Sequence, residues 1–192
     1  MNYLFHLYLA EPTEASLLGG MLGDFVKGRL DDRWPEGIRR GIERHRGIDS
    51  FAQGNAVIRH SLRRIDPAYR HCRPVLIDVF YDHFLAKNWP RHADIPLERF
   101  AQRFYQILET HHDLLPPALQ RIAPRMIAGH WLESYRDLNT VEIVLQRLAE
   151  RLSRPTPLAQ GAAELRRHYR EFEEDFNAFL PQAVSHARTF PA

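Results

Sequence analysis

Two aspartates interrupt an otherwise apolar stretch, VLIDVFYDHFLAKNW, at residues 75–89. If the stretch is helical, with about 100° of rotation per residue, Asp78 and Asp82 lie within about 40° of each other. Val75, Leu85 and Trp89 share that sector, so both carboxylates lie in the middle of an apolar face. An unpaired buried charge is costly. The pattern therefore predicts a partner on this face that neutralises the carboxylates.

A second predicted helix carries a histidine and an aspartate on its inner face. On a helical wheel anchored at Ile38, Ile42 lies about 40° away, and His45 and Asp49 each lie within about 20°. His45 and Asp49 are four residues apart, so both side chains can point at one object. With the two carboxylates of 75–89 they suit a metal site. The alternative is a buried His–Asp hydrogen bond and two carboxylates capped by protein groups.

Three further polar residues occur in apolar surroundings. Asp24 follows LLGGMLG at 17–23, whose glycines allow another backbone to approach closely, and it adds a carboxylate to the candidate site. His6 lies within YLFHLYLA, where a single histidine is usually a core residue with satisfied hydrogen bonds. His83 lies about 100° from Asp82, so it faces either the flank of the same site or a separate neighbour.

The candidate ligands are imidazole and carboxylate groups, without sulfur. This set favours Mn²⁺, Mg²⁺ or Fe²⁺ over a structural zinc ion. Such a site suits hydrolysis of phosphate esters, because the metal lowers the pKa of a water molecule and neutralises phosphoryl oxygens. Asp49 or His83 is the expected base for the proton of that water. A ferritin-like diiron site would need Glu-x-x-His pairs on two helices, and none occurs near these residues.

Helical periodicity dominates the chain, and strand alternation is nearly absent. We expect one all-α domain over residues 1–192, a compact bundle of about eight helices. The expected helices are 13–28, with Thr13 as N-cap, 35–53, 55–65, 74–89, 96–112, 117–135, 140–152 and 160–179.

Composition narrows the class of protein. The single cysteine, Cys72, excludes a disulfide framework and a thiolate zinc site, and fits a reducing cytoplasm. Residues 1–10 are apolar but too short for a membrane span and lack the basic start of a signal peptide. The formal net charge of +2 does not by itself imply nucleic acid. We therefore expect no nucleic-acid partner and no membrane association.

Two arginine-rich segments and one aromatic segment leave two interpretations open. The arginines either form a solvated face or dock an acidic partner. They are Arg39, Arg40, Arg44, Arg59, Arg63 and Arg64. The segment HWLESYRD at 130–137 either belongs to the core with salt bridges or lines a substrate channel, through Trp131, Tyr135 and Arg136.

Several of these motifs occur together in a known family. The segments MNYLFHLYLA, GGMLGDFVKG, RHRGID, LIDVFYDHFL and WLESYRD, in this order and spacing, resemble the acyl carrier protein phosphodiesterases over nearly the whole chain. That family is similar to the His-Asp (HD) metallophosphohydrolases, which are all-α, with the motif order altered. The resemblance implies an HD-domain-like fold and an enzyme that uses Mn²⁺, or a related divalent ion, to remove the 4′-phosphopantetheine arm from holo-acyl carrier protein.

The resemblance also implies which residues form the active site. It assigns Asp24, His45, Asp49, Asp78, Asp82 and His83, with His6 close by. The His-Asp adjacency of ordinary HD proteins is reversed here as Asp82-His83. Because acyl carrier proteins are acidic, the two arginine-rich segments become the expected docking surface. The alternatives are an HD-type hydrolase of a small nucleotide or phosphodiester, and a helical binding protein without enzymatic activity.

Overall fold

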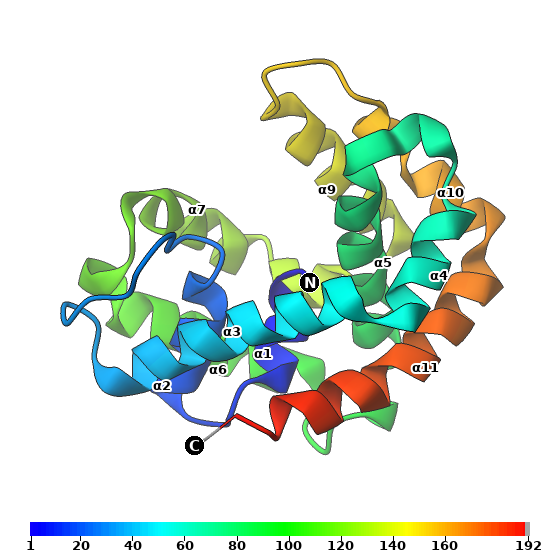
Figure 1. Ribbon diagram of the computed structural model, residues 1–192. Coiled ribbons are helices and arrows are strands. Elements are labelled where there is room, and N and C mark those ends of the chain that lie inside the picture. Colours follow the sequence, from blue (N-terminus) through cyan, green and yellow to red (C-terminus); the bar gives the residue numbers. More distant parts are fainter. Residues whose placement is uncertain (191–192) are drawn as a thin grey trace.

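Helix α5 (Arg73–Lys87) forms the centre of the molecule because it is apolar on nearly every side. In the computed structural model, which describes residues 1–190, α5 is packed by α1, α4, α9 and α11 (Figure 1). Its fully buried side chains include Leu76, Ile77, Val79, Phe80, Tyr81, Phe84 and Leu85. The carboxylates predicted on this helix are therefore held by the most buried element of the fold.

Every regular element within residues 1–190 is a helix, which confirms the all-α prediction. The α-helices are α1 (Tyr3–Leu9), α2 (Glu14–Leu22), α3 (Glu36–Gly54), α4 (Ala56–Arg64), α5, α6 (Leu97–Thr110), α7 (Pro117–Ala128), α8 (Trp131–Ser134), α9 (Leu138–Glu150), α10 (Ala162–Arg167) and α11 (Tyr169–Ala187). Short 3₁₀ turns are η1 (Pro67–Cys72), η2 (Trp89–Arg91), η3 (His112–Leu114) and η4 (Pro157–Gln160).

Helix α1 was not among the expected helices, because seven residues are too few for periodicity to reveal a helix. It is held by a tertiary contact instead. The backbone N–H groups of Leu4 and Phe5 donate to the two carboxylate oxygens of Asp82, at 3.0 and 2.9 Å. This contact fixes the start of the chain against the middle of α5.

Helices α2 and α3 cross at very close range, as the glycine-rich run predicts. A Cβ added to Gly19 would lie 2.7 Å from the Cα of Gly41, closer than real Cβ contacts. A Cβ added to Gly23 would lie 2.6 Å from Nδ1 of His45. Thr13 caps α2 as predicted, accepting a hydrogen bond from the Ser16 N–H at 3.2 Å. The glycines therefore let the α3 side chains reach the start of the chain.

Three of the expected helices differ from the structure by more than two residues at an end or are divided. The first ends at Leu22 rather than at residue 28. The helix expected over 117–135 is divided at Gly129 and His130, and His130 adopts a left-handed conformation with φ of 47°. The helix expected over 160–179 is divided at His168, and its second part continues to Ala187.

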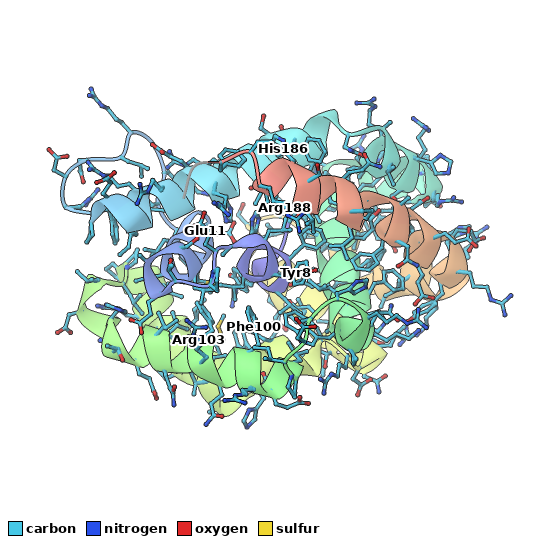
Figure 2. The ribbon with its side chains drawn as sticks, turned by 90° about the horizontal axis from the view of Figure 1, so that it is seen from below. Tyr8, Glu11, Phe100, Arg103, His186 and Arg188 are labelled. Carbon is cyan, nitrogen blue, oxygen red and sulfur yellow. The ribbon has the colours of Figure 1, made fainter. Side chains whose placement is uncertain are left out.

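The N-terminal helices are enclosed from both sides. Seen from below, Tyr8 and Glu11 at the α1–α2 junction lie between Arg188, at the end of α11, and Phe100 and Arg103 of α6 (Figure 2). In the part of the chain that the structure describes, no helix is both long and apolar enough to cross a membrane.

Candidate active site

Two histidines from different helices form the floor of the site. His6 of α1 and His45 of α3 stack with their ring centroids 3.5 Å apart, and their exposed fractions are 1% and 3%. Burial lowers the pKa of His6 to about 3, so its imidazole is neutral near pH 7. A neutral imidazole is the form that binds metal.

A hydrogen bond to the backbone sets the orientation of His45. Its Nδ1–H donates to the carbonyl oxygen of Gly20 at 2.7 Å. The remaining nitrogen, Nε2, lies 3.3 Å from Oδ2 of Asp49 and 3.7 Å from Oδ1 of Asp24. A nitrogen lone pair that faces two carboxylates is unfavourable unless a proton or a metal ion lies between them. Metal-binding histidines are commonly fixed in this way, through a backbone carbonyl on the other ring nitrogen.

Asp49 lies where all these groups meet. Its Oδ1 accepts from the Met1 ammonium group at 2.7 Å and lies 3.1 Å from Nε2 of His6. Burial opposes ionisation of Asp49, but hydrogen bonds from His45 and His6 outweigh it and hold the pKa below its ordinary value. Asp49 therefore stays ionised and is better suited to binding a cation than to accepting a proton.

A protein cation lies at the same carboxylates. The Met1 ammonium group lies 3.6 Å from Oδ1 of Asp78, in addition to its contact with Asp49. Burial alone would lower the pKa of this amine, but the charges of Asp78 and Asp49 outweigh it and raise the pKa to about 10. The cluster thus has the electrostatic character of a cation-binding site.

The carboxylates form an accessible rim above the buried histidines. The side chains of Asp24, Asp49 and Asp78 are 36%, 33% and 34% exposed. Burial raises the pKa of Asp24 and of Asp78 above the ordinary value, whereas that of Asp49 is lowered. When neighbouring carboxylates at one site have pKa values shifted in opposite directions, one typically stays an anion and another accepts a proton.

The residues present fit a divalent metal ion. His6, His45 and Asp49 each offer a ligand atom, and these atoms all lie within 4.8 Å of one another. Nδ1 of His6 is buried without a hydrogen-bond partner within residues 1–190. Asp24 and Asp78 stand beside this group. The donor set is nitrogen and oxygen, as the sequence predicts, and these five residues form the N-terminal cluster.

Two predicted site residues lie outside the N-terminal cluster. Asp82 is fully buried, and each of its oxygens accepts a backbone N–H group of α1, so its hydrogen bonds are with the backbone and not with the cluster. His83 donates from Nδ1 to the Tyr135 carbonyl and accepts at Nε2 from the Tyr169 hydroxyl, both at 2.8 Å. Of the two alternatives for His83, these hydrogen bonds favour the separate neighbour, and its role as a catalytic base stays a prediction.

The predicted docking arginines divide into two groups. Arg44 is buried and pairs with Glu11, and Arg64 pairs with Asp175 at 2.9 Å, so both hold the fold together instead of facing a partner. Arg39 and Arg40 pair with acids on the surface, Asp32 and Glu36. Arg59 and Arg63 line a hollow of about 310 Å³, together with Arg70, His71 and Arg73.

The predicted channel residues are also divided. Trp131 and Tyr135 line a cavity of about 260 Å³, but Arg136 pairs with Glu98 and is not among the lining residues. The cavity also has two arginines, Arg147 and Arg151, that the sequence reasoning did not select. Their spacing of four residues on an apolar helix was the available signal. Nothing in the sequence indicates that the Met1 amine lies between Asp49 and Asp78.

Comparison with known proteins supports the resemblance. The family model described as acyl carrier protein phosphodiesterase matches residues 1–183. Curated proteins with that name include those of Serratia proteamaculans, 33% identical, and Yersinia enterocolitica, 32% identical, each covering 98% of both chains. That of Klebsiella pneumoniae is 34% identical over 96% of both chains. No solved structure matches the chain. The chain belongs to the acyl carrier protein phosphodiesterase family.

Proposed function

We propose that this protein is a divalent-metal-dependent phosphodiesterase that removes the 4′-phosphopantetheine arm from holo-acyl carrier protein. The observation that carries the proposal is the N-terminal cluster, in which two buried imidazoles face three carboxylates that are each about one third exposed. The substrate is suggested by the relatives, which are named for action on acyl carrier protein. The relation to HD-type metallophosphohydrolases is part of the same proposal.

The residues that would hold the metal are His6, His45 and Asp49, with Asp24 and Asp78 beside them. The nitrogen and oxygen donors favour Mn²⁺, with Mg²⁺ or Fe²⁺ as alternatives. When bound, such an ion lowers the pKa of a water molecule and offsets the charge of the phosphoryl oxygens.

The protein's own residues account for positioning and proton transfer. The Gly20 carbonyl holds the His45 ring in place, so that Nε2 stays directed at the carboxylates. Asp24 or Asp78 accepts the proton that the attacking water loses, because burial raises the pKa of each carboxyl toward the working pH. The water oxygen bonds to phosphorus as the bond between phosphorus and the serine oxygen breaks, and the serine oxygen takes up the proton that the carboxyl group accepted from water. The products are apo-carrier and 4′-phosphopantetheine.

An acidic carrier needs a basic docking surface near the site. The hollow lined by Arg59, Arg63, Arg70 and Arg73 is the part of the predicted arginine surface that presents several positive charges together. Arg73 begins α5, and Asp78 lies on the same helix about one and a half turns further along. We assign docking to this hollow rather than to Arg44 and Arg64.

Mass spectrometry of the carrier tests the function. Purified protein is incubated with holo-acyl carrier protein and Mn²⁺, and the carrier is then weighed. We expect loss of the mass of the phosphopantetheine arm, abolished by a chelator and by Asp49→Asn. The matched control is Asp113→Asn, at an exposed carboxylate outside the cluster. An unchanged carrier mass, with turnover of a small nucleotide, would instead support the HD-type alternative.

A further inference from the structure

A cavity of about 260 Å³ lies between the N-terminal segment and helices α8 and α9. Its wall is mostly apolar and includes Trp131, Ile143, Val144 and Leu148. Ile143 is 46% exposed, so an apolar part of this wall can be reached from solvent. No acidic side chain lines the cavity. This composition suits a mostly apolar chain better than a cation or a polar peptide.

The cavity and the N-terminal cluster share a wall. Asn2 and Tyr3 line the cavity and directly follow Met1, whose ammonium group contacts Asp49. Nδ2 of Asn2 donates to the Tyr135 hydroxyl at 2.7 Å, which ties this wall to the segment after α8. In Figure 1 the yellow-green segment that joins α7 to α9 passes beside the N-terminus. A ligand in the cavity would therefore end next to the cluster.

The phenol of Tyr3 is influenced by charges of both the cluster and the cavity. Burial, followed by the charge of Asp24, raises its pKa to about 12, whereas the charge of Arg151 lowers it. Tyr3 and Arg151 both line the cavity, and the phenol of Tyr3 also senses the charge of Asp24, a carboxylate of the cluster.

A strained connection positions the aromatic wall of the cavity. His130 has φ of 47°, a conformation that is uncommon for a residue other than glycine. A Cβ added to the preceding Gly129 would lie 2.9 Å from the ring of Trp131, so only glycine lets that ring lie where it does. Strained backbone is retained when the surrounding structure enforces it, commonly at ligand sites.

The two arginines of the cavity lack carboxylate partners. Neither Arg147 nor Arg151 forms an ion pair with any of residues 1–190. Arg147 lies in the last turn of α9 and Arg151 directly follows the helix, and both line the same cavity. Guanidinium groups donate hydrogen bonds to phosphate and amide oxygens. The cavity therefore combines an apolar wall with donors for oxygen acceptors.

We infer that this cavity binds the pantetheine arm of the substrate while the phosphate lies at the N-terminal cluster. The inference rests on the proposed function. The arm is a narrow chain with a dimethyl group and two amides attached to a phosphate, which matches apolar walls, guanidinium donors and a neighbouring cation site. The volume admits one such chain and excludes a protein surface. Arg151 donates to a phosphate oxygen, and Arg147 donates to an amide carbonyl of the arm.

Calorimetric titration of the full chain with pantetheine, which has no phosphate and no carrier, tests the cavity directly. We expect the wild type to bind pantetheine and Val144→Phe, which fills the cavity, to weaken binding by about tenfold or more, equivalent to about 1.4 kcal/mol. The matched control Leu114→Phe enlarges an exposed apolar side chain in η3, outside the cavity, and should bind as the wild type does. Absence of pantetheine binding to the wild type, or equal binding by Val144→Phe, would overturn the inference.

Kinetics separate this inference from the proposed function. Arg147→Gln should raise KM for holo-carrier and leave hydrolysis of methyl p-nitrophenyl phosphate, which has no arm, unchanged; Arg121→Gln on α7 is its control. This variant also keeps the test valid if Val144→Phe does not fold. If the wild type hydrolyses the carrier and Arg147→Gln has an unchanged KM, the role of Arg147 in the cavity is overturned. If the wild type fails to hydrolyse the carrier at all, the proposed function fails instead.

Discussion

Substitution of Gly23 by alanine should displace His45 without altering any ligand atom. The backbone of Gly23 is in the right-handed helical region, so alanine is conformationally allowed there. The added Cβ would lie 2.2 Å from Cγ of His45 and 2.6 Å from its Nδ1, so at the nearest atom it is about 1.2 Å inside the ordinary contact distance of 3.4 Å. The ring must move away from the added Cβ. Because it is stacked on His6 at 3.5 Å and hydrogen-bonded to Gly20 at 2.7 Å, any such movement disturbs one of these contacts.

The size of the effect follows from this geometry. Overpacking of a filled interior costs about 1–3 kcal/mol, which lowers Tm by about 2–4 °C per kcal/mol in a chain of this length. Displacement of a ligand by more than about 0.5 Å also weakens a metal site, so we expect Mn²⁺ affinity to fall by about 10- to 100-fold, as when a group that orients a ligand is removed.

Gly20→Ala provides the matched control for Gly23→Ala. Its added Cβ would have its nearest neighbour, the His6 carbonyl oxygen, at 3.6 Å, which is ordinary contact. Alanine within a helix should leave stability unchanged or raise it by up to about 1 kcal/mol. Thermal unfolding without metal and Mn²⁺ titration are measured for both variants. If Gly23→Ala matches Gly20→Ala in both assays, the close contact between α2 and His45 does not position the ligand.

Three further predictions concern Asp82, the docking hollow and Arg44. Burial raises the pKa of Asp82 from 3.8 to about 7, so its contribution to stability is present below about pH 4 and lost as pH rises through 7. Asp82→Asn should remove this pH dependence of the free energy of unfolding. If urea unfolding gives the wild type and the variant the same dependence on pH, the prediction is wrong. Arg63→Glu should raise KM for the carrier several-fold with kcat unchanged, and the effect should fade with salt because screening extends over about 10 Å at 0.1 M. Arg121→Glu is the control, and a KM that does not respond places the docking surface elsewhere. Arg44→Ala should lose about 1–3 kcal/mol of unfolding free energy, because it leaves Glu11 unpaired, and should leave KM unchanged. A raised KM without loss of stability would instead indicate that Arg44 belongs to the docking surface.

Much of the N-terminal cluster follows from spacing alone. The four-residue interval between His45 and Asp49 places both on one face of α3, and the same interval on α5 turns Asp78 and Asp82 toward the start of the chain. The glycines of 17–23 predicted a close approach, and Gly23 does admit the His45 ring. Periodicity of this kind is local, so one sequence is enough to reveal it.

The remaining features depend on contacts between distant parts of the chain. Asp82 and Asp78 have the same local pattern, but one meets the backbone of α1 and the other the Met1 amine, which only the tertiary structure decides. Arg64 looks like a surface arginine until Asp175, 111 residues later, is placed beside it. The helix expected over 117–135 is interrupted at His130 by a left-handed backbone conformation, which the residue types there do not predict.

The central claim is that the N-terminal cluster binds a divalent metal ion. Titration of the protein with Mn²⁺, followed by the electron paramagnetic resonance signal of the free ion, tests it without reference to any substrate. We predict loss of the free-ion signal on addition of wild-type protein or of Asp113→Ala, and a free-ion signal close to that of buffer with Asp49→Ala. Binding by Asp49→Ala as tight as that of the wild type, or no binding by the wild type, would contradict the account.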